Sequence, residues 1–316
     1  MAAMLEAIAR QDVALPLEVI VVDGLSDDGT VERIGDFADR HPEIAVTVIP
    51  NPARVVPDAM NLGIEAALGE VIVRMDAHAL PSDDYVRRCL TLLEQPGVAV
   101  VGMPWRIRSS SPARIARAIA AAAGHPFGIG DARYRLGADT AQDVDTVPFG
   151  VFRKTLWRQM GGFDTALPAN QDYEFNYRAR VAGGRVVLGT EAHCVYFPRT
   201  TLRALARQNY RYGHWKAQML KANPRALRAR QLAAPALVAH TAGLGLLATR
   251  SPRARRAWLL GLGLYGGAAA TSAGRVARRT GDRGLVPAIL AAFACIHGSW
   301  GAGFLLGLLP RRGRHP

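Results

Sequence analysis

The sequence predicts an α/β protein with a mostly parallel sheet over residues 1–198, a basic amphipathic segment over 199–230 and hydrophobic membrane helices over 231–316. In the first part, short apolar runs alternate with helical segments, which is the pattern of βαβ units. The last part contains long runs without charge. The chain has 316 residues, of which 49% are hydrophobic. This length and composition are sufficient for a sizeable core and exclude general disorder.

The predicted strands are short apolar runs, because a strand that is buried on both faces shows no polar alternation. They lie at residues 17–22, 44–49, 70–75, 98–103, 147–153 and 185–188. The predicted helices lie at residues 30–40, 57–68, 82–94 and 171–182, with Ser82 and Asn170 as N-caps of the last two. The Gly-rich residues 124–137 are expected to form a mobile loop.

Two predicted strands end in a carboxylate, Asp23 and Asp76. Ligands of open α/β sheets bind beyond the carboxyl ends of the strands, so we expect both acids at the ligand-binding edge of one sheet. The patterns GxGxxG and GxxxxGK[ST] are absent, which weighs against dinucleotide-binding and P-loop functions. The 3 cysteines form neither a disulfide framework nor a four-cysteine zinc site, and favour a reducing compartment.

Charge divides the chain sharply. Residues 1–198 carry 19 Lys and Arg against 25 Asp and Glu, whereas residues 199–316 carry 20 against Asp282 alone. The uncharged runs 231–249, 257–274 and 285–309 approach the length that crosses a bilayer. Arginines flank every run, so three simple crossings would conflict with the positive-inside tendency, and one run is expected to be re-entrant or interfacial. The alternative is a buried helical domain with Arg-rich loops.

The N-terminal residues contain Glu6 and no apolar segment of signal-peptide type, so we expect the first part to stay in the cytoplasm. The sequence pI of 10.4 suggests nucleic-acid binding as one class of function. The basic residues, however, flank apolar runs instead of forming an aromatic-lined groove, and we therefore expect no nucleic-acid partner.

Three positions carry candidate chemistry. Asp76 and His78 point the same way in an extended segment and form a candidate site for Mg²⁺ or Mn²⁺, held by both residues or by Asp76 alone. Asp172, in a first helical turn, is a candidate general base. Each acid has a purely structural alternative, a backbone hydrogen bond for Asp76 and helix stabilisation for Asp172.

The basic segment before the membrane runs is the third position. The guanidinium of Arg211 can donate two parallel hydrogen bonds to the oxygens of a diphosphate. The alternative is an amphipathic helix on anionic lipid. Its polar face would consist of Arg203, Arg207, Arg211 and Lys216, with Tyr212 and Trp215 at the interface.

Five segments in the same order resemble family 2 glycosyltransferases with the GT-A fold, and more narrowly the succinoglycan-type exopolysaccharide glycosyltransferases. They are VIVVDGLSDDGT (19–30), NLGIEAALGEVIVRMDAHA (61–79), VPFGVFRKTLWRQMGGFD (147–164), NQDYEFNYRARVAGG (170–184) and FPRTTLRALARQNYRYGHWK (197–216). The resemblance covers residues 1 to about 220.

The resemblance implies roles for individual residues. Asp23 corresponds to the acid that contacts the nucleotide base, usually uracil, and Asp76 to the first acid of the DxD motif. His78 stands where most members have the metal-binding Asp. Asp172 corresponds to the catalytic base, with Gln171 replacing the usual Glu. The remaining substrate-binding positions that the resemblance implies are Asn61, Gln208 and Arg211, the last two within a QxxRW-like motif with Tyr212 in place of Trp.

The implied function is inverting sugar transfer from a nucleotide-sugar, usually a UDP-sugar, to a lipid-linked or polysaccharide acceptor, with a divalent metal, at the cytoplasmic side of the inner membrane. Two enzymatic alternatives are a polyprenyl-phosphate sugar transferase and a processive synthase, the latter disfavoured by the small membrane part. Family members begin with a strand of the type VSVVIP, which is missing here. A truncated, non-catalytic scaffold is therefore a further alternative.

Overall fold

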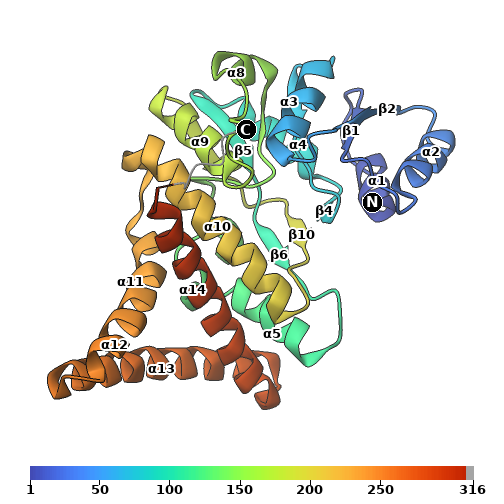
Figure 1. Ribbon diagram of the computed structural model, residues 1–316. Helices are drawn as coiled ribbons and strands as arrows, with labels where there is room; N and C mark the ends of the chain where they lie inside the picture. Colours follow the sequence, from blue (N-terminus) through green and yellow to red (C-terminus); the bar gives the residue numbers. More distant parts are fainter. Residues whose placement is uncertain (311–316) are drawn as a thin grey trace. The chain divides into compact units, whose positions relative to one another are not determined.

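The computed structural model describes residues 1–310 and divides into two compact units (Figure 1). The first unit consists of Met1–Arg106 and Arg133–Tyr196, and the second of Ile107–Ala132 and Phe197–Pro316. Residues 107–132 thus group with the C-terminal helices. Of the arginines flanking the uncharged runs, Arg311, Arg312 and Arg314 lie outside the described residues.

A two-stranded parallel sheet opens the first unit. It pairs β1 (Glu18–Asp23) with β2 (Ala45–Pro50), and Asp23 aligns with Pro50. Helices α1 (Ala2–Ala9) and α2 (Thr30–Arg40) supply apolar side chains, among them Leu5 and Phe37, to a core with Val21. Met75 also packs against this core. The segment that carries Asp76 is therefore attached to the β1–β2 layer.

A five-stranded sheet forms the centre of the first unit, in the order β3-β8-β5-β9-β7. Its strands are β3 (Val71–Val73), β5 (Val98–Gly102), β7 (Gln142–Asp143), β8 (Val151–Arg153) and β9 (Arg185–Leu188). β5 and β9 are parallel, whereas β8 is antiparallel to both of its neighbours, and β7 is antiparallel to β9. The expected mostly parallel sheet is therefore found only in part, because β8 inserts between β3 and β5 in the opposite direction.

The two acids at strand ends do not share a sheet. Within residues 1–310, β1 pairs with β2 in one ladder, and β3 begins another. The expectation that Asp23 and Asp76 lie at the edge of one sheet is therefore wrong. Helix α3 (Val56–Ala66) packs on β1, where Gly63 lies close to the side chain of Val22.

Three further helices complete the first unit. α8 (Lys154–Gln159) follows β8, and α9 (Gln171–Val181) packs through Phe175 and Ala179 on the five-stranded sheet. α4 (Tyr85–Leu93) begins three residues later than expected, and its N-cap is Asp84, so the prediction of Ser82 as the N-cap is wrong. The Ser82 hydroxyl instead donates to Asp84 Oδ1 at 2.8 Å. A three-stranded sheet joins β4 (Ala79–Pro81), β10 (Cys194–Tyr196) and β6 (Trp105–Ile107).

The second unit is helical. Its elements are α5 (Arg114–Ala123), α6 (Pro126–Ile129), α10 (Leu202–Ala222), α11 (Ala233–Ala239), α12 (Gly245–Ala248), α13 (Pro252–Thr280) and α14 (Val286–Leu308). The expected loop over residues 124–137 instead contains α6 and, in the first unit, α7 (Arg133–Leu136). α5, α10, α13 and α14 share a core around Ile119, Leu205 and Phe293.

Glycines bring α10 and α14 into close contact. A Cβ on Gly213 would collide with the backbone of Trp300, and one on Gly303 with the backbone of Tyr210. Only glycine permits this approach, which is the packing mode favoured between membrane helices.

Two helical segments are long and apolar enough to cross a membrane, Ala229–Ala248 and Arg283–Leu308. The expected second run, residues 257–274, lies in α13, which is not among these candidates within residues 1–310.

Candidate active site

The central feature of the first unit is Arg74, for which the sequence motifs predict no role. β3 ends at Val73, and Arg74 follows with a side chain only 12% exposed. Its Nη2 lies 2.7 Å from Asp76 Oδ1. Its Nη1 donates to Asp172 Oδ2 at 3.0 Å. One guanidinium thus brings together the two predicted acids, which come from the end of β3 and the start of α9.

The backbone around Phe149 supports Arg74. The Arg74 guanidinium lies over the Phe149 ring, 5.1 Å from its centroid, and the Arg74 amide donates to the carbonyl of Gly150. Phe149 has a φ of 51°, which is unusual for a bulky residue. The buried Tyr85 hydroxyl donates to its carbonyl at 3.2 Å. A strained residue held by its surroundings is typical of functional sites.

The environment of Asp172 alters its acidity. Burial raises the pKa of Asp172, the Arg74 guanidinium opposes this increase, and the carboxylate of Asp76 adds to it. The Asp172 side chain retains 25% of its exposure. Asn170, the predicted N-cap, precedes it with a φ of 66°. A partly exposed carboxylate with a raised pKa has the properties of a general base.

His78 lies beside Asp76 but contacts it only loosely. Its Nε2 is 4.0 Å from Asp76 Oδ2, and its side chain is half exposed. Within residues 1–310, no group of three or more His, Cys, Asp or Glu side chains is arranged to hold a metal ion. One carboxylate oxygen and one imidazole nitrogen nevertheless fit a divalent cation that takes its remaining ligands from phosphate and water.

Asp23 is buried at the end of β1. Its two carboxylate oxygens accept hydrogen bonds from the Ser26 hydroxyl at 2.6 Å and from the Ser26 amide at 2.8 Å. These bonds, that from the hydroxyl foremost, lower the pKa of Asp23. The residue is therefore a fixed, ionised acceptor in the loop after β1.

Asn61 holds the turn between α8 and α9. Its Oδ1 accepts from the Trp157 indole at 3.0 Å and from the Phe163 amide at 2.8 Å, and its Nδ2 donates to the Phe163 carbonyl at 2.9 Å. Arg178 completes the arrangement, since it pairs with the buried Glu174 and donates to the carbonyl of Gly162. In the structure, the Asn61 amide is thus engaged within the protein.

Gln208 and Arg211 lie on α10 in the second unit. Gln208 Nε2 donates to the Tyr212 hydroxyl at 3.2 Å. The alternative prediction, a helix with Lys216 on its polar face, is wrong for that residue, because Lys216 is only 2% exposed and its Nζ contacts Met219 Sδ.

A sequence signal for Arg74 did exist. The segment EVIVRM is apolar except at its first residue and at Arg74, and Arg74 is two residues before Asp76. Alternation in an extended segment places such residues on the same side. The contact with Asp172 spans 98 positions of sequence, however, and only the fold reveals it.

Comparisons with known proteins show the family to which this chain belongs. Residues 1–214 match the family model described as "Glycosyltransferase like family 2". The succinoglycan biosynthesis protein ExoA of Rhizobium meliloti (strain 1021) is 29% identical over 316 residues, which cover 99% of this chain and 92% of that protein. A dolichyl N-acetyl-alpha-D-glucosaminyl phosphate 3-beta-D-2,3-diacetamido-2,3-dideoxy-beta-D-glucuronosyltransferase of Methanococcus voltae is 25% identical over 65% of this chain and 64% of its own length.

A solved structure shows the same fold. The mannosyltransferase PcManGT from Pyrobaculum calidifontis, in complex with GDP-Man and Mn²⁺, superposes with a TM-score of 0.62 at 23% identity. The match covers 93% of this chain and 81% of that one. The predicted GT-A fold and glycosyltransferase activity are confirmed, and the chain belongs to the family 2 glycosyltransferases.

Proposed function

We propose that this glycosyltransferase is a membrane-associated inverting enzyme of exopolysaccharide or cell-envelope glycan synthesis. It moves a sugar from a nucleotide-sugar, of which a UDP-sugar is the first choice, to a lipid-linked or polysaccharide acceptor. The names of the two relatives, a succinoglycan biosynthesis protein and a transferase acting on a dolichyl-linked sugar, support this assignment. The observation that carries it is the bridge from Arg74 to Asp76 and Asp172.

Asp172 acts as the base of the transfer step. Its carboxylate takes the proton of an acceptor hydroxyl, and the oxygen so activated attacks the anomeric carbon of the donor. The bond between that carbon and the diphosphate oxygen breaks, and the diphosphate leaves with the electron pair. Attack opposite the leaving group inverts the configuration. Arg74 keeps Asp172 ionised despite its burial, because a nearby positive charge favours the carboxylate.

The donor is held by the acids at the strand ends. Asp23, ionised and fixed by Ser26, contacts the nucleotide base. Asp76 and His78 would hold Mn²⁺ or Mg²⁺, which supplies positive charge to the departing diphosphate. The match of Gln208 and Arg211 to the QxxRW motif supports a role in binding the diphosphate, with Arg211 as the charged fork and Gln208 as a neutral amide donor. Asn61 supports the donor site through the turn that it holds.

The membrane assignment rests on the second unit. The segments Ala229–Ala248 and Arg283–Leu308 are long enough to cross, with the catalytic unit on the cytoplasmic side of the inner membrane. An enzyme held at this surface suits an acceptor that is itself attached to a lipid.

Release of nucleoside diphosphate from a panel of UDP- and GDP-sugars tests the proposal, with the full chain in membranes and with lipid-linked acceptors. We expect one donor to be consumed in an acceptor-dependent manner, and Asp172→Asn to abolish the consumption. Acceptor-dependent transfer by Asp172→Asn at the unchanged rate would remove Asp172 as the base. Failure of every donor would favour the scaffold alternative.

A further inference from the structure

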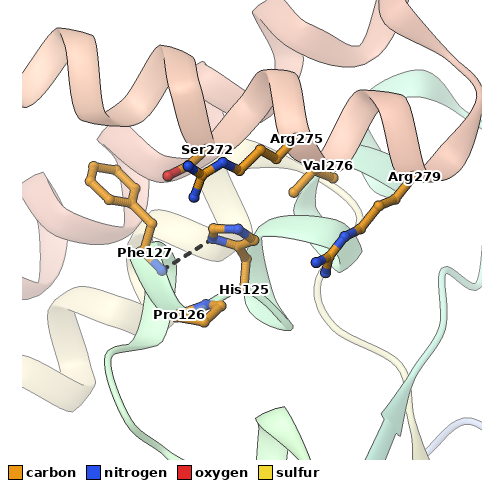
Figure 2. A pocket seen from close by; sticks show the side chains of 7 residues that line it. All are labelled: His125, Pro126, Phe127, Ser272, Arg275, Val276 and Arg279. Atoms are coloured by element: carbon orange, nitrogen blue, oxygen red, sulfur yellow. Dashed lines mark hydrogen bonds between the residues drawn. The ribbon is translucent and has the colours of Figure 1, made fainter.

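A cavity of about 400 Å³ lies within the second unit, between the segment after α5 and helix α13. It is lined by His125, Pro126, Phe127, Ser272, Arg275, Val276 and Arg279. Figure 2 shows both arginines reaching from α13 toward the segment that carries His125. None of the residues assigned above to sugar transfer lines this cavity.

The cavity carries positive charge without a balancing acid. None of its lining residues is acidic. Asp282 is the one acidic residue of positions 199–316, and its carboxylate pairs with Arg117 at 3.0 Å. Arg275 and Arg279 are one helical turn apart on α13, so their guanidinium groups can bind one anion together. Arginine forks match the geometry of phosphate better than that of other common anions.

Hydrogen bonds and ring contacts fix Phe127, which lines the side of the cavity opposite α13. The Phe127 amide donates to His125 Nδ1 at 3.1 Å, and His297 Nε2 lies 2.8 Å from the Phe127 carbonyl. The Phe127 ring packs edge-on against Phe293, 4.9 Å between centroids. Val276 belongs to the core that α13 shares with α5 and α14. The site therefore combines a cationic rim with a rigid apolar wall.

The pKa of His125 reflects the same charge. Burial foremost, and then Arg279 and Arg275, lower the pKa of this imidazole. With Nδ1 accepting from the Phe127 amide, the neutral ring carries its proton on Nε2 and remains a hydrogen-bond donor. An anion in the cavity would offset the charge of the two arginines and restore the pKa toward its ordinary value.

The surface of α12 and α13 indicates the source of the anion. Five leucines on these helices are more than half exposed: Leu246, Leu247, Leu259, Leu260 and Leu264. Arg253, Arg255 and Arg256 lie in the first turns of α13, which is not itself among the candidate spans within residues 1–310. On α13 itself, the exposed Leu259, Leu260 and Leu264 occur together with these arginines, a combination that is typical of a helix in the bilayer interface.

From this geometry we propose that Arg275 and Arg279, with Ser272 and His125, form a binding site for the phosphate of a membrane lipid, whose apolar chain lies against Pro126, Phe127 and Val276. The shared chemistry is a phosphoryl group on an apolar chain. It is present both in bilayer phospholipids and in prenyl phosphates that carry sugars. The site is separate from the residues proposed for transfer and does not depend on their roles.

Lipid retention by the purified full chain tests the site. The protein is delipidated in neutral detergent, and native mass spectrometry then measures the binding of phosphatidylglycerol, farnesyl phosphate and inorganic phosphate in separate titrations. We expect at least one of the two lipids to bind, and the double variant Arg275→Gln/Arg279→Gln to weaken that binding at least tenfold, since bonds to charged groups are individually strong.

Arg278→Gln is the matched control, because Arg278 is on the same helix and exposed but does not line the cavity. It should change lipid binding less than twofold. Arg275→Lys/Arg279→Lys keeps the charge, and should retain part of the affinity even if the glutamine variant is poorly folded. Phosphatidylglycerol binding identifies a bilayer lipid as the ligand, and binding of farnesyl phosphate alone identifies a prenyl carrier.

Three results would overturn the proposal. The first is equal lipid binding by the wild type and by a folded double glutamine variant. The second is an equal loss in Arg278→Gln, which would mean that total charge and not the cavity is responsible. The third is binding of inorganic phosphate as tightly as either lipid. This would show that the apolar residues of the cavity do not contribute to binding of the lipid chain. Asp172→Asn, measured in parallel, should keep full lipid binding, so that failure of the transfer mechanism is seen separately.

Discussion

Arg74 Nη1 donates to Asp172 Oδ2 at 3.0 Å, and the same guanidinium pairs with Asp76. Two carboxylates so close to each other would repel, and the arginine makes their proximity tolerable. Asp172, the proposed base, and Asp76, the proposed acid of the donor site, are therefore coupled through one side chain. Substitution of Arg74 or Asp76 is expected to alter the titration of Asp172.

Replacement of Arg74 should impair the base more than the fold. In Arg74→Lys, a single ammonium cannot bridge two carboxylates as a fork does. We expect kcat to fall on the order of 100-fold and the acid limb of the kcat profile to move to higher pH, because an ammonium that cannot contact both carboxylates stabilises ionised Asp172 less than the guanidinium does. Arg87→Lys, an exposed arginine paired with Asp12, is the control and should leave the profile unchanged. An unshifted acid limb in Arg74→Lys would contradict the coupling.

The pH dependence of stability should report on Asp172. Its pKa in the folded chain is raised, so its contribution to stability is complete below the pKa of the unfolded chain and is lost as pH rises through the folded value. At neutral pH the ionised carboxylate is thus a net cost. Asp172→Asn is expected to raise Tm by a few degrees at pH 7, with little difference near pH 3, while transfer is lost. Calorimetry at the two pH values checks this; a lower Tm at pH 7 would mean that the Arg74 pair outweighs burial.

Replacement of Asn61 tests whether this residue stabilises the fold or contacts the donor. Asn61→Ala removes three hydrogen bonds and leaves the Phe163 amide without its partner. We expect the free energy of unfolding to fall by about 2 kcal/mol, measured by denaturant titration. Donor KM in the surviving folded enzyme separates the two roles. A large increase in KM at unchanged stability would favour direct contact with the donor.

His78 should determine which metal the enzyme uses. His78→Asp restores a carboxylate pair with Asp76, and oxygen ligands favour Mg²⁺. We expect activity with Mg²⁺ to rise relative to Mn²⁺, whereas His78→Ala should require roughly tenfold more of either ion. Titration of initial rates with each metal measures both effects. Identical metal dependence in wild type and His78→Ala would exclude the imidazole as a ligand.

Local patterns predicted most of the elements, but not how they pair. The helix at 30–40 and the strand at 185–188 occur as expected, because apolar periodicity and glycine breaks define them locally. The antiparallel insertion of β8 depends on partners far away in sequence, which periodicity does not encode. The helices α6 and α7 were missed because glycine usually breaks helices.

The same distinction applies to the site. A strand end and a first helical turn predict Asp76 and Asp172 as site residues, and both are local features. The role of their common partner Arg74 depends on a long-range contact, which local patterns do not predict. The burial of Lys216 likewise follows from packing in the second unit and not from its place on a helical wheel.

The glycine contacts between α10 and α14 have a mechanical consequence. The backbones of the two helices are in contact at Gly213 and Gly303, with no side chains between them at these points. One helix therefore cannot easily slide along the other. If α14 enters the bilayer as proposed, a change in membrane thickness that shifts α14 would also move α10, on which Gln208 and Arg211 lie. The lipid environment would then act on two of the residues that are proposed to bind the donor.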